Sequence, residues 1–443
     1  MSQEPGNRKK STVRHTRAIQ YAHTKQPVST PTDEQVKERL TELVHPATLG
    51  QVSYFHTLGL RTRTLNLVIM MAFVLELLWR QLSGVCELTR IVQKEAVLWA
   101  APVKVSQQAL SERLTTMPAE LFERVLTNVL PVAQQRWQER QRPQPAEIAW
   151  ALANYSGVYA ADGSTLDALI RKIGLLQDQA TNPLAGRMTA LLDLGSRLPT
   201  QVWYEEDPQA HDQRFWPQIL GALPANALLL IDMGYINFGM FAKMTQQNKR
   251  FITRAKSNLA FDLAETLFEN SKVRDRLIWV GSGEARQQLR LVEILYRGKW
   301  FRYLTNELDA KRLPTAYVVA LYWQRWRIED AYNMVKRLLG LAYFWCGAQN
   351  AVRLQVWATW LLYVVLIDLT DAVAEAMHLP FTTISIEMVY RSLYFFTQAR
   401  QRGAATELIA YLVQNAKLLG LVKRKHNSDK PDPLAFVHSL TVL

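Results

Sequence analysis

The hydrophobic pattern changes character near residue 145, and this change restricts the folds that the chain can adopt. From 34 to 140 the apolar residues recur every three or four positions, as in Leu121, Val125 and Val129, which predicts helices. The prolines of the Pro-Gln-Pro sequence at 143–145 then interrupt this period and predict a domain boundary. Beyond them, short apolar runs alternate with helical segments. The pattern therefore predicts a mixed α/β sheet with helices packed against it.

The predicted strands fall into two groups. The first group begins as a meander and continues as strands that alternate with helices; its members are 155–161, 189–194, 201–204, 227–231 and 250–255. The second group is expected to form an inserted β subdomain at about 260–310; its members are 277–280, 289–296 and 300–306. Pro314 suits the first turn of a long helix that ends at Gly340. Residues 346–443 are expected to form a C-terminal helical region.

The charge balance favours a polyanionic partner. The chain has 52 Lys and Arg against 39 Asp and Glu, a formal net charge of +13, and nucleic acid is the first candidate for its partner. Residues 1–33 are expected to form a flexible basic arm that lies along phosphates, with a merely solubilising tail as the alternative. The 2 cysteines and 8 histidines show no CxxC, HxH or HExxH spacing, which excludes a disulfide scaffold and gives no support for a zinc site.

Neither export nor a membrane span is expected. The chain opens with the polar sequence MSQEPGNRKK, which has no apolar core of a signal peptide. The apolar runs 67–78 and 356–367 are interrupted or ended by charged residues, and each is shorter than the roughly 20 apolar residues that a bilayer requires. We therefore expect a cytoplasmic, nucleoid-associated protein that has no membrane partner.

Residues 34–145 are expected to form a helical DNA-binding domain. Two short helices, 82–93 and 106–114, are separated by a break at 100–102, as in a helix-turn-helix motif. The second helix carries Gln107, Gln108, Ser111 and Arg113, which could reach base edges or phosphates. An ordinary helical hairpin with a polar outer face remains the alternative.

Four candidate functional residues lie on the long helix predicted after Pro314. At about 100° per residue, Tyr322, Arg325, Glu329 and Lys336 lie within an arc of about 60°. A carboxylate flanked by an arginine and a lysine on one helix face can bind a cation and a phosphate together. The alternative is a solvated face with ion pairs between residues three or four positions apart.

This spacing, Y-x2-R-x3-E-x6-K, resembles the Y-R-E-K signature of the IS-four group of bacterial insertion-sequence transposases. The resemblance implies an RNase H-like catalytic core over 150–345 that uses an Asp-Asp-Glu triad. Two aspartates match: Asp162 ends the strand 157–161, and Asp232 ends the strand 228–231 and is followed by Met-Gly-Tyr, similar to the D-x-G-Y context of the family. Together with Glu329 they are the predicted catalytic and metal-binding residues.

Three carboxylates have a physical reason to converge in a basic protein. Hard oxygen ligands are those that Mg²⁺ and Mn²⁺ prefer. Two such ions, about 3.5 to 4 Å apart, can activate the attacking oxygen and stabilise the leaving one during in-line displacement at phosphorus. The expected cofactor is therefore two ions of Mg²⁺ or Mn²⁺.

The resemblance also implies DNA contacts on the signature helix. Tyr322 and Arg325 would contact phosphate near the cleavage point, and Lys336 would hold the DNA end. The planar fork of arginine suits bidentate phosphate binding.

Further DNA contacts are implied outside the helix. Arg254 and Lys256 are similar to the basic strand that follows the second acid in relatives, with a solvated edge strand as the alternative. Trp300 resembles the tryptophan of the inserted strands that stacks on a flipped base when family members form a DNA hairpin. A tryptophan buried in the core is the alternative for this position.

The functional expectation is a DNA transposase. It would cleave the ends of its element by hydrolysis and join the 3′-hydroxyl to target DNA, with a hairpin intermediate and a homodimer acting on paired ends implied by the relatives. Two alternatives stay open: a domesticated DNA-binding protein without turnover, and a metal-dependent nuclease that cleaves DNA without joining it.

Overall fold

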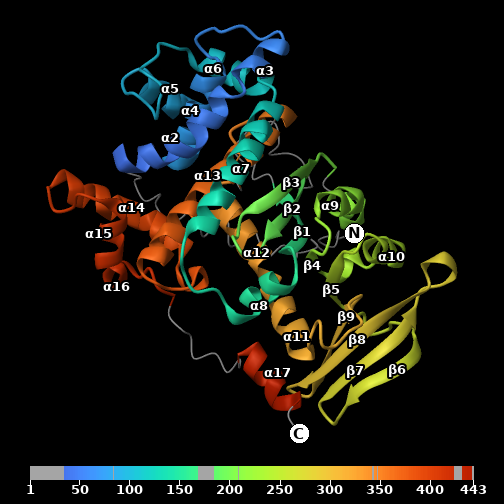
Figure 1. Cartoon of the computed structure of the whole chain (residues 1–443). Helices are drawn as coiled ribbons and strands as arrows, with labels where there is room; N and C mark the ends of the chain where they lie inside the picture. Colours follow the sequence, from blue (N-terminus) through green and yellow to red (C-terminus); the bar gives the residue numbers. More distant parts are fainter. Residues whose placement is uncertain are drawn as a thin grey trace, which may run out of the picture.

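The structure is a computed structural model that describes residues 34–82, 84–167, 184–207, 209–341, 344–346, 348–423 and 432–441. Its centre is a mixed sheet, with a group of N-terminal helices at one end and a strand-rich extension at the other (Figure 1). The predicted α/β class is therefore confirmed. The predicted basic arm, 1–33, lies outside the described residues.

The N-terminal helices surround an apolar core. They are α2 (Glu34–Leu49), α3 (Val52–Thr57), α4 (Leu67–Trp79), α5 (Val85–Val92), α6 (Gln107–Thr116), α7 (Glu120–Glu139) and α8 (Ala146–Asn154). Side chains are buried almost all round α4, and the side chain of Asn66 caps the helix by accepting from the backbone N–H of Ile69. Helices α5 and α6 match the two short helices predicted for the helix-turn-helix motif, and Ser106 caps α6. Their contact with DNA remains a prediction.

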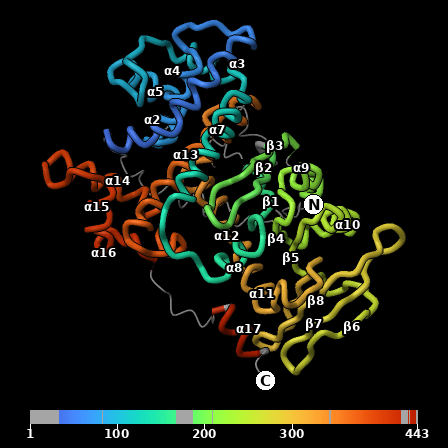
Figure 2. Tube along the Cα trace, in the orientation of Figure 1, coloured from blue at the N-terminus to red at the C-terminus, as the bar shows by residue number. Residues whose placement is uncertain are grey.

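Helix α13 (Gln349–Ala376) runs through the middle of the molecule (Figure 2). It is long and apolar enough to cross a membrane. However, 94% of its apolar stretch of 18 residues is buried inside the protein, as in a core helix. It packs against α7 and α4 on one side, and its Asp368 and Asp371 form buried ion pairs with Arg140. The helix extends beyond the apolar run 356–367 on both sides, and the polar residues Gln355, Asp368 and Asp371 that flank this run are also buried.

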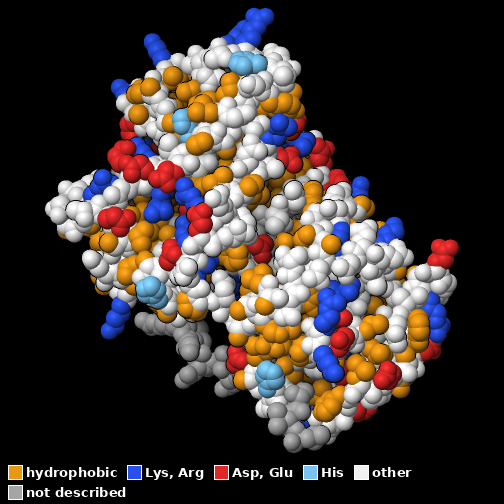
Figure 3. Space-filling view, in the orientation of Figure 1, with side chains coloured by type: hydrophobic (Ala, Val, Ile, Leu, Met, Phe, Trp, Pro, Cys, Tyr) orange, Lys and Arg blue, Asp and Glu red, His pale blue; other side chains and the backbone are white. Residues whose placement is uncertain are grey.

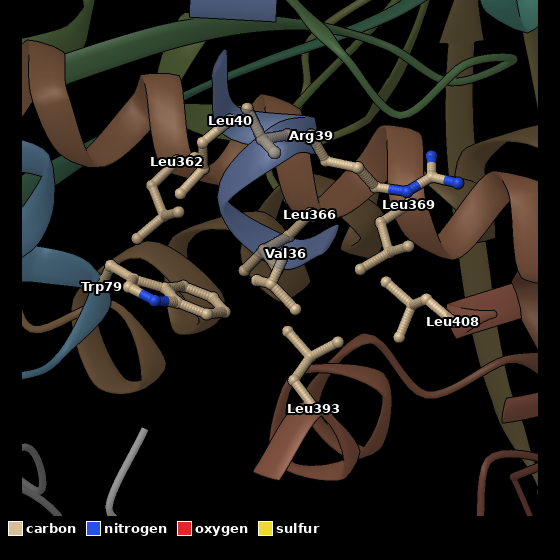
Figure 4. A pocket seen from close by; sticks show the side chains of 10 residues that line it. Val36, Arg39, Leu40, Trp79, Leu362, Leu366, Leu369, Leu393 and Leu408 are labelled. Carbon is tan, nitrogen blue, oxygen red and sulfur yellow. The ribbon is translucent and has the colours of Figure 1, made fainter. Parts of the chain in front are cut away.

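The helical core is tightly packed where α2, α4 and α13 meet α14 (Ile386–Gln401) and α15 (Leu408–Gln414). Figure 4 shows the side chains of Val36, Trp79, Leu366 and Leu393 directed toward one another from four of these helices. The cavity that remains between them is about 10 Å³, room for about one water molecule. This junction therefore holds no ligand-sized space.

The sheet has nine strands in the order β3-β2-β1-β4-β5-β9-β8-β7-β6. The strands are β1 (Val158–Asp167), β2 (Leu184–Asp193), β3 (Pro199–Glu205), β4 (Leu228–Ile231), β5 (Arg250–Arg254), β6 (Asp262–Glu269), β7 (Val273–Val280), β8 (Gln287–Tyr296) and β9 (Lys299–Thr305). Strands β1, β4 and β5 are parallel neighbours, and β2 and β3 continue the sheet as antiparallel strands. The predicted mixed sheet, a meander followed by strands that alternate with helices, is therefore present.

Strands β6 to β9 extend the same sheet, because β9 pairs with β5 in antiparallel register. The three strands predicted in this region are present as β7, β8 and β9. The sequence pattern did not predict β6, since this edge strand is mostly exposed and its sequence, DLAETLFE, lacks a clear apolar alternation. On the face seen in Figure 3, basic and acidic side chains are interspersed over the extension. Ion pairs join Arg276 to Glu269 and Arg302 to Glu293 there.

One face of the central strands is covered by two short helices. These are α9 (Trp216–Ala222) and α10 (Phe238–Gln246), with the single turns η2 (Asp212–Phe215) and η3 (Met233–Tyr235) beside them. Their core is aromatic: Phe241 stacks on Phe251 of β5 with ring centroids 4.0 Å apart. Packing of this kind fixes the loops that follow β4.

The long helix predicted from Pro314 to Gly340 is divided in the structure. It comprises α11 (Thr315–Gln324), α12 (Trp326–Asn333) and the π-helical segment η5 (Met334–Leu338). Around Arg325 the backbone forms tighter bonds three residues apart, from the N–H of Arg325 to the carbonyl of Tyr322 and from the N–H of Ile328 to the carbonyl of Arg325. Single π-helical turns such as η5 are frequent at functional sites.

Two further helices complete the C-terminal region, α16 (Ala416–Leu419) and α17 (Pro433–Thr441). Helix α17 packs against α11, as Figure 1 shows beside the strand-rich extension. The C-terminal residues therefore help to hold α11, the helix that carries Tyr322.

Candidate active site

Two of the predicted acids follow neighbouring parallel strands. The pairing of β1 with β4 ends at Ala161 and Ile231, so that Asp162 and Asp232 are the next residues along the two strands. The prediction that the first strand ends at Asp162 needs correction: β1 continues to Asp167 because it still pairs with β2 on its other side. Parallel strands end at the same edge of a sheet, so both carboxylates lie at that edge.

Arg325 joins the first acid to the third. Its Nη1 lies 3.3 Å from Oδ2 of Asp162, and its Nη2 lies 2.9 Å from Oε1 of Glu329. The guanidinium is buried, with only 6% of Arg325 exposed. The structure therefore brings Asp162 and Glu329 to opposite sides of one buried cation.

A residue of the same helical region, Tyr322, contacts the second acid, Asp232. The hydroxyl of Tyr322 donates to Oδ1 of Asp232 over 3.5 Å, at the long limit for a hydrogen bond. Tyr322 is buried, and its ring contacts that of Tyr303 on β9 with centroids 5.3 Å apart. The three predicted acids thus surround Arg325 and Tyr322, which occupy adjoining positions at the break between α11 and α12.

Burial and neighbouring carboxylates change the pKa values of residues in the site. Burial raises the pKa of Asp162 to about 6; the Arg325 guanidinium opposes this rise, and the carboxylates of Asp212 and Glu329 add to it. Burial also raises the pKa of Tyr322 above its ordinary value. The Asp162 carboxylate is therefore destabilised by burial even with the Arg325 guanidinium beside it.

The carboxylates of the site are suitable ligands for a divalent cation, but the side chain of Arg325 now lies between them. Among the residues that the structure describes, no three His, Cys, Asp or Glu side chains come close enough together to hold a metal ion. Three carboxylates, those of Asp162, Asp232 and Glu329, nevertheless lie around Arg325, and carboxylates are donors that Mg²⁺ and Mn²⁺ prefer. A guanidinium now lies where their negative charges converge.

Two of the predicted DNA-binding residues border this site. Lys336 lies in η5, and its Nζ donates to the carbonyl of Thr165 on β1, three residues beyond Asp162. Arg254 ends β5 and lies over the ring of Phe301 at 5.7 Å. Both cations therefore lie on elements that adjoin the acids.

The other two predicted DNA-binding residues, Lys256 and Trp300, lie further from the acids. Lys256 is exposed in the segment after β5. Trp300 is half-buried on β9, where the guanidinium of Arg274 lies 4.4 Å above its ring. Strand alternation places Trp300 on the face of β9 opposite to that of Tyr303, which packs against Tyr322. The structure therefore does not bring Trp300 to the acids.

Sequence reasoning missed a tyrosine that holds the first acid in place. The hydroxyl of Tyr332 on α12 donates to the backbone carbonyl of Asp162 at 2.5 Å and accepts from the N–H of Ala190 on β2 at 2.9 Å. It thereby connects the helix that carries Glu329 to the strand that carries Asp162. The spacing of three residues between Glu329 and Tyr332 was a usable signal, because such residues share a helix face.

Sequence reasoning also missed an ion pair beside the first acid. Arg187 of β2 and Asp212 of η2 are in contact next to Gly163. Asp212 lies in a loop without any motif, so that only the folded structure reveals its position.

A comparison with protein families gives one match that overlaps this site. Residues 183–365 match the family described as the transposase DDE domain. The matched range contains Asp232 and the signature residues Tyr322, Arg325 and Glu329, and it begins after Asp162.

Curated relatives carry the same kind of name. A protein of Sinorhizobium fredii named as a transposase is 28% identical over 160 residues, 33% of this chain and 43% of that protein. A transposase for insertion sequence element IS4SA from Synechocystis sp. is 22% identical over 163 residues, 36% of this chain and 46% of that protein. A transposase for insertion sequence element IS5377 from Geobacillus stearothermophilus is 24% identical over 238 residues, 52% of this chain and 59% of that protein. The chain thus spans about half the length of the curated relatives it matches.

One solved structure is similar over most of the chain. It is the cryo-EM structure of a piggyBac transposase synaptic complex with hairpin DNA, and the similarity covers 92% of this chain and 86% of that chain. The TM-score is 0.40 and the sequence identity is 11%, values too low to support an argument about fold or function.

Proposed function

We propose that the protein is a DNA transposase that cleaves the ends of its element and joins them to target DNA. Residues 183–365 match the transposase DDE domain, and curated relatives are named as transposases for insertion sequence elements. The observation that carries the proposal is the convergence of Asp162 and Glu329 on Arg325, with Asp232 bonded to the adjoining Tyr322. A solvated helix face does not explain this arrangement, because Arg325 is buried and reaches a carboxylate on a distant strand.

The three carboxylates are the proposed ligands of two Mg²⁺ or Mn²⁺ ions. When bound, such ions activate an attacking oxygen and stabilise the leaving oxygen at phosphorus. Tyr332 holds the backbone of Asp162 in place, and the helical turn between Arg325 and Glu329 fixes the position of the third acid. Arg325 must move out of the space between Asp162 and Glu329 for the acids to approach a shared cation.

DNA supplies the proposed new partner for Arg325. Two oxygens of one phosphate can accept the two N–H bonds that Asp162 and Glu329 now accept, one each, from the guanidinium. Tyr322 and Lys336 would contact the same strand near the cleavage point. Arg254 and Lys256 would extend the basic border along the neighbouring strand, where backbone phosphates dominate affinity.

The remaining proposals concern assembly and placement of the DNA. The helical domain at 34–145 and the basic arm at 1–33 would bind terminal inverted repeats, and two copies of the protein would act on paired ends. Trp300 would stack on a flipped base if cleavage proceeds through a hairpin, which requires it to exchange its contact with Arg274 for the base. The proposed location is the bacterial nucleoid.

Cleavage and joining, assayed separately, test the proposal. The purified chain is incubated with Mg²⁺ and DNA that carries the terminal repeats of its own element, and nicks and joined products are measured in parallel. Asp232→Ala is expected to abolish both products while DNA binding persists. The matched control Asp330→Ala removes the neighbour of Glu329, which pairs with Arg327 and is 62% exposed, and it is expected to keep both activities.

The outcomes separate the candidate functions. Wild-type protein that binds DNA but yields neither product would be a binding protein that has lost turnover. Nicked DNA without joined product would identify a nuclease. Either result contradicts the transposase proposal.

A further inference from the structure

An ion pair occupies the place where the sheet no longer fixes the two aspartates. The register of β1 with β4 ends one residue before Asp162 and Asp232, so no ladder hydrogen bond sets the separation of these residues. Arg187 and Asp212 meet at this point. Both side chains are mostly buried, with 16% and 22% of their surfaces exposed.

The pair lies directly on the backbone that follows Asp162. A Cβ atom added at Gly163 would lie 2.2 Å from Oδ1 of Asp212 and 2.7 Å from Nη2 of Arg187. Real Cβ atoms do not approach other heavy atoms this closely, so a larger residue at 163 would displace the side chains of the pair. Glycine at 163 therefore permits a close approach of the two charged groups to the backbone of the first acid.

Each partner is anchored to a different half of the site. Arg187 projects from β2, opposite Thr165 of β1, and is thus fixed relative to Asp162. Asp212 begins η2, where the neighbouring Gln213 donates to the backbone carbonyls of Gly234 and Ile236 at 3.3 and 3.2 Å.

Asp212, the acidic partner of the ion pair, is held against the segment that follows Asp232. Trp216, at the end of the same segment, donates to the carbonyl of Tyr235 at 3.1 Å, and a Cβ at Gly234 would lie 3.7 Å from Oδ2 of Asp212. The ion pair consequently bridges the segment after the first acid and the segment after the second.

One feature of the Arg187–Asp212 ion pair indicates that it does more than stabilise the fold. Nε of Arg187 is buried and has no hydrogen-bond partner among the atoms that the structure describes. Leaving a buried donor of this kind unpaired costs free energy, and such groups require a reason. Support of an adjacent site provides one.

Resting on the proposed function, we propose that Arg187 and Asp212 are positioning residues, whose ion pair sets the separation of Asp162 and Asp232 so that both can contact the same metal centre. Neither residue needs to contact the metal or the DNA for this role. Groups that orient metal ligands typically change metal affinity by 10- to 100-fold when they are removed.

Mn²⁺ binding to the full-length, DNA-free protein tests the inference, with the free ion measured by electron paramagnetic resonance. Asp212→Asn, which keeps the shape and removes the charge, is expected to weaken Mn²⁺ binding by about tenfold or more. Arg187→Gln should weaken it similarly, and the double variant should be no worse than either single variant. Arg187→Lys, which keeps the charge, should recover most of the affinity.

The matched control is Asp330→Asn, which breaks the exposed Arg327–Asp330 pair on α12 and should leave Mn²⁺ binding unchanged. In cleavage assays, Asp212→Asn should raise the Mn²⁺ concentration needed for half-maximal rate without changing the KM for DNA. A merely structural defect would instead lower the melting midpoint and all activities together.

The inference is overturned if Asp212→Asn melts like the wild type and binds Mn²⁺ within twofold of it; if that variant does not fold, Arg187→Gln decides by the same criterion. Wild-type Mn²⁺ binding that is insensitive to Asp162→Asn overturns both the inference and the proposed metal site. Wild-type protein that binds Mn²⁺ through Asp162 but cleaves no DNA contradicts the proposed function alone, and the Asp212 variant still decides the inference.

Discussion

Arg325 and Glu329, one helical turn apart, form a 2.9 Å ion pair whose guanidinium also reaches Asp162 on the central strand. In the absence of DNA, the arginine that is proposed to bind phosphate thus occupies the space between two proposed metal ligands. Under the proposed function, binding of DNA and loading of metal would be linked through one side chain, because a phosphate that captures Arg325 would release the acids.

Arg325→Gln is expected to tighten Mn²⁺ binding to the DNA-free protein while it weakens DNA binding. Removal of a positive charge within 3.3 Å of the acids eliminates a competitor for their oxygens, and an increase of at least about tenfold in Mn²⁺ affinity is reasonable for partly buried charges at this range. Calorimetric titration of Mn²⁺, with and without DNA, measures the change.

Arg327→Gln is the matched control, since Arg327 lies on the same helix but pairs with the exposed Asp330. In the wild type, DNA should increase Mn²⁺ affinity, and Arg325→Gln should reduce this coupling. Equal Mn²⁺ affinities in the Arg325 and Arg327 variants would contradict the proposed competition.

The pH dependence of stability should carry a contribution from Asp162. Burial raises the pKa of this carboxyl from 3.8 to about 6 in the folded protein, so the folded state retains a proton that the unfolded state has lost. The metal-free protein should accordingly lose stability as the pH rises from about 4 through 6, by on the order of 2 to 3 kcal/mol from this group.

Melting midpoints between pH 4.5 and 7.5 check this expectation. Asp162→Asn should melt at a higher temperature than the wild type above pH 6, with the difference shrinking toward pH 4.5. Saturating Mn²⁺ should raise the wild-type midpoint at pH 7 and leave that of the variant nearly unchanged. A difference that is constant with pH would show that Asp162 is not destabilised as a carboxylate.

A buried ion pair should dominate the stability of the strand-rich extension. Arg290 on β8 is fully buried and bonds to Asp275 on β7, with Nε to Oδ1 at 2.7 Å, and Thr315 at the start of α11 donates to the same carboxylate. Asp275→Ala leaves the guanidinium charge uncompensated and is expected to lower the free energy of unfolding by about 3 to 5 kcal/mol. Urea unfolding measures the loss.

Asp262→Ala provides the comparison. Asp262 pairs with Arg286 on the surface, where the two side chains are 71% and 52% exposed, and its loss should change stability by no more than about 1 kcal/mol. The account of the buried pair is wrong if both variants unfold at the same urea concentration.

The sequence was informative where local patterns coincide with the fold. The resemblance to insertion-sequence transposases, which rests on the helical spacing up to Glu329 and on strands that end in Asp162 and Asp232, predicted that three acids would meet. The local patterns predicted most of the strands themselves. The ligand roles of the acids remain predictions.

Other features depend on contacts between distant segments and left no local trace. Asp212 reaches the site only because η2 packs on the loop after β4. Arg325 contacts Asp162 on a distant strand, and a helical pattern does not contain this contact. Trp300 was expected from resemblance to stack on a flipped base, which stays a prediction; strand alternation places it on the face of β9 opposite to that of Tyr303.

The central claim is that Asp162, Asp232 and Glu329 hold metal together once DNA has drawn Arg325 away. Anomalous scattering from Mn²⁺, recorded on crystals of the full-length protein bound to DNA from the end of its element, tests this claim most directly. The account predicts anomalous density in contact with all three carboxylates and the Arg325 guanidinium on a phosphate. Density elsewhere, or acids that remain paired with Arg325 in the presence of Mn²⁺ and DNA, would contradict it.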